Sequence, residues 1–372
     1  MDCALDESDA RDLGLLGAFV NVSEHNSVPC FYSCTISIAS YSQPAFYVLV
    51  SRRANDWGAH EDYFVKAVNL VEAIRILVAC PTLTEVQFSF GGMAYWEVWN
   101  SVLPWSENLL SEVFTLLRSS PSLSCFHFIN SQTVHYANLY CKHLQALVCE
   151  NPRLETLTVS AHGPMLVVAK AIADCLSRNT VLKSFTLRIP TLSNDQKQQS
   201  LEILLRPFTS SSPSEANASL KELALHLQYP DGYCRDAIAN LVCRNTTLKK
   251  LDLFFPRNFY SWRELRALAS ALQSNTTLKH VQCINGLDGY GNYTRDDAKK
   301  VTDKNLWQEE FQIQEILRTM IDNELRINTS LESFVVGHWT LLRVGTEWRT
   351  SYRGPCLREQ IKEYNVKVKM IP

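Results

Sequence analysis

A hydrophobic motif of the form L-x-x-L-x-L recurs eight times along the chain. Each copy starts at a leucine, here called the anchor, and has apolar residues three and five positions later, as in Leu248, Leu251 and Leu253. Residues two apart face the same side of a β-strand, so each copy predicts a short strand with one buried face. A weaker copy runs from Pro44 to Val50. The eight anchors are Leu83, Leu123, Leu154, Leu182, Leu220, Leu248, Leu278 and Leu331.

A helix is predicted upstream of seven of the eight anchors. Apolar residues stand six and ten positions before the anchor, as Val242 and Ile238 do before Leu248. Positions four apart lie on one face of a helix, and this face is expected to be buried. The residues six before are Leu77, Leu117, Val148, Leu176, Val242, Leu272 and Leu325, and those ten before are Ala73, Val113, Leu144, Ile172, Ile238, Leu268 and Ile321.

An asparagine stands three positions before the anchor in six of the eight copies. Asparagine tolerates the left-handed backbone conformation that ends a helix, so these residues predict the turn between helix and strand. Four of them also begin Asn-x-Ser/Thr sequons, which we interpret as by-products of the turn. The six are Asn151, Asn179, Asn217, Asn245, Asn275 and Asn328, and the sequons start at the last four.

Each unit therefore reads strand, loop, helix and turn. A single unit cannot bury both its strand face and its helix face, so the units must stack, with the strands in a parallel sheet. Helices are about 10 Å wide and strands are about 4.8 Å apart, so the stack is expected to curve. The sequence predicts an α/β leucine-rich-repeat solenoid, a horseshoe with the parallel sheet on its concave face and the helices on its convex face.

This pattern resembles the ribonuclease-inhibitor-like class of leucine-rich repeats, found in ribonuclease inhibitor and in the sensor regions of NOD-like receptors. The resemblance rests on the L-x-x-L-x-L strands, the helical return and the N-x-x-L turn, as in Asn245-Thr-Thr-Leu248, and it runs from about residue 45 to about residue 340. It implies a horseshoe fold, whereas the class has many unrelated partners. Units here vary in length, unlike those of ribonuclease inhibitor, and no P-loop precedes them.

Three domains are expected: an amino-terminal cap over 1–44, about nine repeats over 45–337 and a carboxy-terminal cap over 338–372. Exposed solenoid ends need such caps. Cys34–Ala39 could add a strand to the first cap, whereas the second cap could contain a helix over Cys356–Tyr364 and an edge strand over Val366–Ile371. The repeats are interrupted by an aromatic-rich insert at 89–107 with Tyr95, Trp96 and Trp99, a Ser/Pro-rich loop at 209–216 and a polar insert at 285–306.

The strand residues between the buried positions are expected to form a polar stripe on the concave face. Because strand side chains alternate between the two faces, these residues must point away from the helices. An extended polar stripe with one exposed phenylalanine suits recognition of a protein surface, and aromatic residues are enriched at binding hot spots. The candidate partner-binding residues are Glu85, Gln87, His127, Thr156, Thr158, Arg188, Glu222, His226, Lys250, Asp252, Phe254 and His280, with Tyr95, Trp96 and Trp99 from the insert.

Composition narrows the class of partner. The net charge is −2 and the pI is about 6.5, without the basic character of most nucleic-acid binders. No run approaches the roughly 18 apolar residues of a membrane helix, and the acidic start does not resemble a secretory signal. We therefore expect a cytoplasmic monomer that contacts neither nucleic acid nor membrane. Its 12 cysteines are expected to be free thiols, several of them on apolar helix faces.

No cofactor, metal site or catalytic motif is predicted. Cys30 and Cys34, or His135 with Cys141 and His143, could hold zinc, but neither group has a second pair at a recognised spacing. The chain contains no Walker loop, no G-x-G-x-x-G after a strand, no G-x-S-x-G and no H-E-x-x-H. Acidic residues and histidines meet on any polar sheet, so their proximity alone does not indicate an enzyme.

The function favoured by these observations is that of a non-catalytic scaffold or adaptor that binds a protein through the concave face. One alternative is a regulator of an enzyme, such as a small-GTPase activator of the Ran type. That function needs an exposed arginine near the amino-terminal end, where Arg52 and Arg53 are available. A second alternative is a detached sensor region of an innate-immune receptor.

Overall fold

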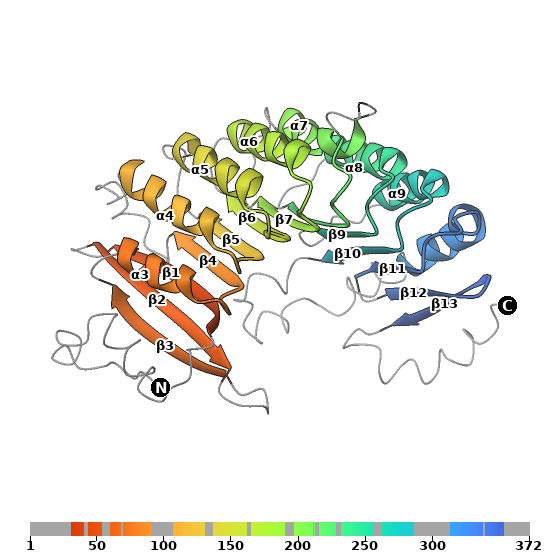
Figure 1. Cartoon of the computed structure of the whole chain (residues 1–372). Helices are drawn as coiled ribbons and strands as arrows, with labels where there is room; N and C mark the ends of the chain where they lie inside the picture. The colour runs from red at the N-terminus through yellow and green to blue at the C-terminus, as the bar shows by residue number, and fades with distance from the viewer. Residues whose placement is uncertain are drawn as a thin grey trace. The chain divides into compact units, whose positions relative to one another are not determined.

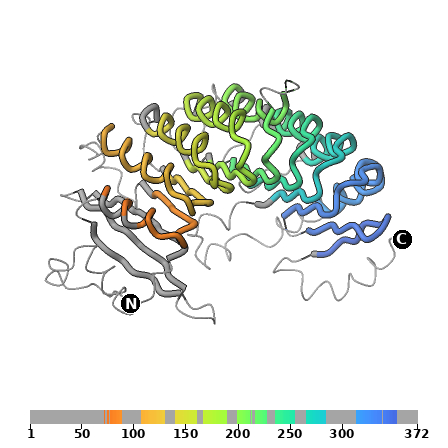
Figure 2. The backbone as a smooth tube through the Cα atoms, viewed as in Figure 1, coloured from red at the N-terminus to blue at the C-terminus, as the bar shows by residue number. Residues whose placement is uncertain are grey.

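The computed structural model describes two compact units, Met1–Leu220 and Lys221–Pro372. Each unit is a row of strands backed by helices, as Figures 1 and 2 show. The described residues are 31–40, 44–53, 60–67, 70–90, 107–130, 137–161, 165–189, 197–210, 212, 216–227, 232–255, 262–285, 313–337 and 339–352.

The first unit contains four repeat strands that pair in parallel and in chain order. They are β4 (Glu85–Phe90), β5 (Cys125–Asn130), β6 (Thr156–Ala161) and β7 (Ser184–Ile189). Helices lie along one face of this sheet (Figure 1). They are α3 (Leu70–Ala79), α4 (Glu107–Ser119), α5 (Ala137–Glu150), α6 (Met165–Arg178) and α7 (Lys197–Thr209).

Three longer strands precede these repeats: β1 (Phe31–Ser40), β2 (Pro44–Arg53) and β3 (His60–Ala67). The expected strand over Cys34–Ala39 is part of β1, which pairs in parallel with β4. The interpretation of Pro44–Val50 as a weak repeat strand is wrong, because β2 runs antiparallel to β1 and to β3. An apolar run specifies a strand but not its direction, and here the end of β1 at Ser40 pairs with the start of β2 at Pro44, so the two strands run in opposite directions.

The second unit contains the parallel strands β8 (Glu222–Leu227), β9 (Lys250–Phe255), β10 (His280–Asn285) and β11 (Ser333–Val336). Its helices are α8 (Gly232–Arg244), α9 (Trp262–Ser274) and a helical segment over 313–320 that continues as the π-helix η3 (Ile321–Leu325). Antiparallel strands β12 (Trp339–Val344) and β13 (Glu347–Tyr352) follow β11. The expected elements at Cys356–Tyr364 and Val366–Ile371 lie outside the described residues.

The hydrophobic motif correctly predicts which residues form the core of both units. Every repeat strand begins two residues after its anchor, and all eight anchors are at most 1% exposed. The apolar residues three and five positions after each anchor are equally buried, from Val86 and Phe88 to Phe334 and Val336. The helix stripe is confirmed at Val113, Leu117, Leu144, Val148, Ile172, Leu176, Ile238, Val242, Leu268, Leu272, Leu77 and Leu325, all buried. The chain is therefore an α/β leucine-rich-repeat solenoid.

The recurrent asparagines connect neighbouring units through their side chains. Asn275 Nδ2 donates to Val242 O at 2.7 Å and to Asn245 O at 2.9 Å, both in the preceding repeat. Its Oδ1 accepts from the backbone N–H groups of Thr277 at 2.9 Å and Leu278 at 2.7 Å. The sequence predicts the turn from the backbone conformation that asparagine tolerates. The structure adds hydrogen bonds from the asparagine side chain to the preceding repeat, here called asparagine bridges. Carbonyl groups of the preceding repeat are bonded in the same way by Asn151, Asn179, Asn217 and Asn328.

These bridges predict that the four sequons carry no glycan in the folded protein. Their asparagines are 2–4% exposed, and the amide nitrogen to which a glycan would be attached is a buried donor in Asn217, Asn275 and Asn328. Secretion-targeted expression followed by peptide mass mapping, with and without an amidase that removes N-glycans, should show no mass change in the peptides that contain these four asparagines. Quantitative glycosylation of Asn275 in a folded, secreted chain would contradict this assignment.

Candidate functional site

The candidate binding surface is the sheet face opposite the helices in each unit. Parallel sheets are usually covered on both faces. Here the described repeat helices cover one face, and the alternate strand residues on the other are mostly half-buried or exposed. Each unit has one such open sheet face, and these faces contain all the described candidate residues. Tyr95, Trp96 and Trp99 lie outside the described residues, as do most of the inserts at 89–107 and 285–306.

In the first unit the parallel register aligns the candidate residues in rows across the strands. Glu85 pairs with Cys125, which pairs with Thr156, and Gln87 pairs with His127, which pairs with Thr158. Hydroxyl groups dominate the rows on β6 and β7. Thr158 is only 6% exposed, less than its position on the open face suggested. At the end of β7, Nε of Arg188 is buried and has no hydrogen-bond partner in the described part of the chain.

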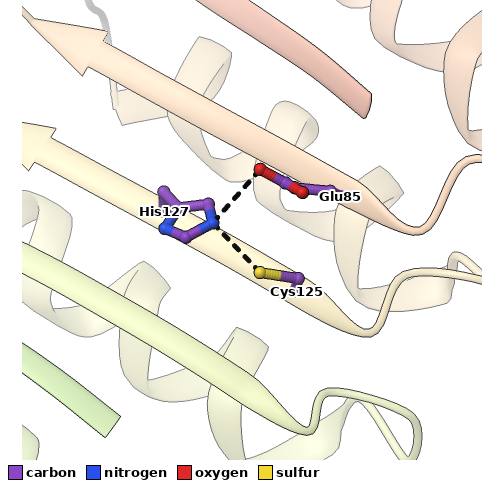
Figure 3. Close-up of side chains that lie close together, drawn as sticks. All are labelled: Glu85, Cys125 and His127. Atoms are coloured by element: carbon purple, nitrogen blue, oxygen red, sulfur yellow. Dashed lines mark hydrogen bonds and ion pairs between the residues drawn. The ribbon is translucent and has the colours of Figure 1, made fainter. Parts of the chain in front are cut away.

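Glu85, Cys125 and His127 form a compact cluster on β4 and β5, shown in Figure 3. Nε2 of His127 lies 3.0 Å from Cys125 Sγ and 3.3 Å from Glu85 Oε1. One ligand atom from each residue lies within 4.8 Å of the other two. Because Cys125 and His127 are two apart on one strand and Glu85 is in register with Cys125, the alternation of side chains brings all three to one point.

This cluster does not have the arrangement of a cysteine nucleophile. In such a site one ring nitrogen contacts the thiol and the other contacts an orienting carboxylate. Here both contacts are made by the same atom, Nε2 of His127. Burial and the Glu85 charge raise the pKa of the Cys125 thiol to about 12, so it is protonated at neutral pH. Burial lowers the pKa of His127, opposed by Glu85 and reinforced by the Arg188 charge.

The open face of the second unit is richer in charge. Glu222 aligns with Lys250, and Lys250 aligns with His280. Lys250 Nζ donates to Asp252 Oδ2 at 2.8 Å, and this hydrogen bond raises the pKa of Lys250. His280 Nδ1 lies 2.9 Å from the hydroxyl oxygen of Ser333 on β11. The face is thus a row of mutually oriented polar groups.

An aromatic pair lies on the same face. The rings of His226 and Phe254 stack with centroids 3.7 Å apart and planes 9° apart. Both residues are half-buried, on the neighbouring strands β8 and β9. Farther along this face, Leu342 on β12 is in register with Ser333 and is 47% exposed. The second unit therefore presents apolar and polar groups together, a composition that suits contact with a protein surface.

Sequence reasoning missed two of these residues. Cys125 was not among the candidates, although it has the same strand alternation as His127 and that alternation would have placed it on the open face. Leu342 was missed because β12 lies beyond the last motif.

Of the zinc candidates named from the sequence, Cys141 and His143 lie on α5, where both are buried, and Cys30 and His135 are outside the described residues. Within the described residues, no helix is long and apolar enough to cross a bilayer.

Comparison with known proteins finds matches among solved structures. No protein-family model and no curated protein matches the sequence. Among solved structures, actin-binding site 2 of leiomodin-1 is similar with a TM-score of 0.28 and 18% identity, over 56% of this chain and 91% of that chain. The C-terminal domain of tropomodulin from Caenorhabditis elegans has a TM-score of 0.29 and 12% identity, over 45% of this chain and 92% of that chain. Values this low do not transfer binding properties to this chain.

Proposed function

We propose that the protein is a non-catalytic binding scaffold that recognises another protein through the open sheet face. The observation that carries this proposal is the surface of β8 and β9, where the stacked His226 and Phe254 rings lie beside the Lys250–Asp252 ion pair. A partly exposed aromatic pair next to oriented charges provides both apolar area and directional contacts.

Helices α8 and α9 support the same conclusion by contrast. Their apolar residues are turned into the core, as Ile238 and Leu272 show, and their outer positions are exposed polar residues such as Asn240 and Gln273. The stacked rings of His226 and Phe254 lie on the sheet face instead. A protein partner that buries the pair gains the free energy of removing apolar surface from water, about 25 cal/mol per Å².

We also propose that the two ends of the chain act as caps, over 1–44 and 338–372. The support is a strand at each end that covers the edge of the repeat sheet of its unit. In the first unit β1, within 1–44, pairs with the first repeat strand β4, and in the second unit β12, within 338–372, pairs with the last repeat strand β11. These strands satisfy backbone groups of β4 and β11 that would otherwise form an open edge.

The proposed surface can be tested by comparative affinity purification with a triple variant, His226→Glu, Lys250→Gln and Phe254→Ala. All three side chains are on the open face, so the fold should be retained, as circular dichroism can verify. We expect the partners captured by the unmodified chain to be reduced at least about tenfold, the effect of losing roughly 1.4 kcal/mol. Quantitative mass spectrometry with purified-partner titration would measure the reduction.

The control variant is Asn240→Glu with Gln273→Glu, on the exposed faces of α8 and α9. It lowers the net charge by two, as the triple variant does, but leaves the sheet face unchanged. Partner capture should match that of the unmodified chain. Equal loss in the control and the triple variant would assign the effect to net charge and would remove the sheet face from consideration.

A further inference from the structure

The first unit contains three different metal-binding side chains at one point of its open face. Glu85 offers a carboxylate oxygen, Cys125 a sulfur and His127 an imidazole nitrogen, all within 4.8 Å of one another. Zinc is bound in proteins by this set of donors. We propose that Glu85, Cys125 and His127 form a zinc-binding site with one coordination position left open.

The two distances made by His127 Nε2 are close to those of tetrahedral coordination, and the Cys125 sulfur and the Glu85 oxygen lie within 4.8 Å of each other. With bonds of about 2.0–2.1 Å to oxygen and nitrogen and about 2.3 Å to sulfur, tetrahedral angles require about 3.3 Å between nitrogen and oxygen and about 3.6 Å between sulfur and either. The nitrogen-to-oxygen distance is 3.3 Å and the sulfur-to-nitrogen distance is 3.0 Å. An opening of about half an ångström between Cys125 and His127 would admit the ion, a movement within reach of side-chain rotation.

Hydrogen bonds within the cluster cannot satisfy all three groups at once. Nε2 of His127 has a single in-plane position, occupied either by a proton or by a lone pair. With a lone pair it accepts from the Cys125 thiol, and the Glu85 oxygen then has no donor within the cluster. When it carries a proton, Nε2 donates to the Glu85 carboxylate, and the thiol of Cys125 can no longer donate to it. A cation at the common point accepts a lone pair from all three atoms at once.

Charge and exposure favour an accessible divalent ion. Zinc binds the thiolate, so the thiol proton passes to solvent on binding, and the thiolate together with the Glu85 carboxylate balances two positive charges. The side chains of Glu85 and His127 are 42% and 23% exposed, which leaves the fourth position open to water or to a donor from a partner. Nearby Arg188 adds positive charge, so an anionic fourth ligand such as a carboxylate is favoured over a neutral one.

Titration of the chelator-treated full chain with Co²⁺, and then with Zn²⁺ in competition, tests the site. Cobalt bound to a thiolate gives a charge-transfer absorption that identifies sulfur coordination. We expect this absorption in the unmodified chain, its loss in Cys125→Ser, and weakening of Zn²⁺ affinity in His127→Gln. The weakening should exceed the roughly 10–100-fold caused by changes outside the ligand set.

Glu85→Gln keeps the shape of the site and removes only its charge, so it gives a fold-preserving third variant whose affinity should fall at least about tenfold with the absorption retained. The controls are Cys243→Ser and His280→Gln, an exposed cysteine and an exposed histidine of the second unit, which should bind as the unmodified chain does. Zinc affinity unchanged by Cys125→Ser and His127→Gln, or no Zn²⁺ binding by the unmodified chain, would overturn the proposal. Neither result bears on partner capture through His226 and Phe254, so the two proposals fail separately.

Discussion

Replacing Asn275 with aspartate should lower the free energy of unfolding of the second unit by about 4 kcal/mol at pH 7. The amide Nδ2 donates to Val242 O and Asn245 O in a site only 3% exposed. Aspartate would put a carboxylate oxygen against two carbonyl oxygens, lose two donors and bury a charge. Each buried group left without a partner costs about 1–3 kcal/mol, and more when it is charged.

The effect should also depend on pH. Burial and the two carbonyl groups raise the folded-state pKa of the introduced carboxyl above its unfolded value near 3.9. A group with a raised folded-state pKa stabilises the fold below its unfolded pKa, and that stability is lost as the pH rises through the folded-state value. The deficit relative to the unmodified chain should therefore shrink toward pH 4, when the protonated acid can donate to one carbonyl.

Urea unfolding followed by circular dichroism at pH 7 and at pH 4 would measure both effects. The matched control is Asn240→Asp, the same change at an exposed position of α8, which should alter stability by no more than about 0.5 kcal/mol. If both substitutions cost the same, the asparagine bridges between repeats do not stabilise the stack.

These bridges mark the limit of what the sequence reveals about the fold. The start of every repeat strand follows from its anchor leucine, because alternation and burial are local properties. The recurrence of asparagine is visible as well, but its hydrogen-bond partner is not. The carbonyl group bonded by Asn179 belongs to Val148, one repeat earlier, and the two meet only after the repeats stack. The direction of β2 is hidden for a similar reason, since an apolar run is the same in both orientations.

The same distinction holds for the candidate sites. Strand alternation correctly assigns Glu85 and His127 to the open face, as it does His226 and Phe254. The cluster around His127 is not visible in the sequence, because zinc motifs are recognised by short spacings and Glu85 is one whole repeat away from Cys125. Stacking of His226 on Phe254 likewise requires the register of β8 with β9, which the motif implies only once both strands are known to be neighbours.

Replacing Phe126 with alanine should lower the free energy of unfolding of the first unit by about 3–5 kcal/mol, the usual cost of removing a buried aromatic side chain. Phe126 is 0% exposed, and its ring centroid lies 5.8 Å from that of Phe88 and 6.0 Å from that of Phe114. The three rings join β4, β5 and α4, so the cavity would open at a junction of two repeats. Urea unfolding followed by circular dichroism would give the magnitude.

The matched comparison is Phe254→Ala, the same chemical change on the open face, where the side chain is half-buried and contacts His226. Its cost should be smaller, about 1–2 kcal/mol, because part of the surface that it removes is already in contact with water and no enclosed cavity is left behind. The two substitutions together separate the roles of the two faces. If only Phe126→Ala greatly lowers the free energy of unfolding, the core lies between the sheet and the helices, and the opposite face is available to a partner. Equal costs would mean that Phe254 is also part of the core, and the binding surface proposed on β8 and β9 would then lose its apolar centre.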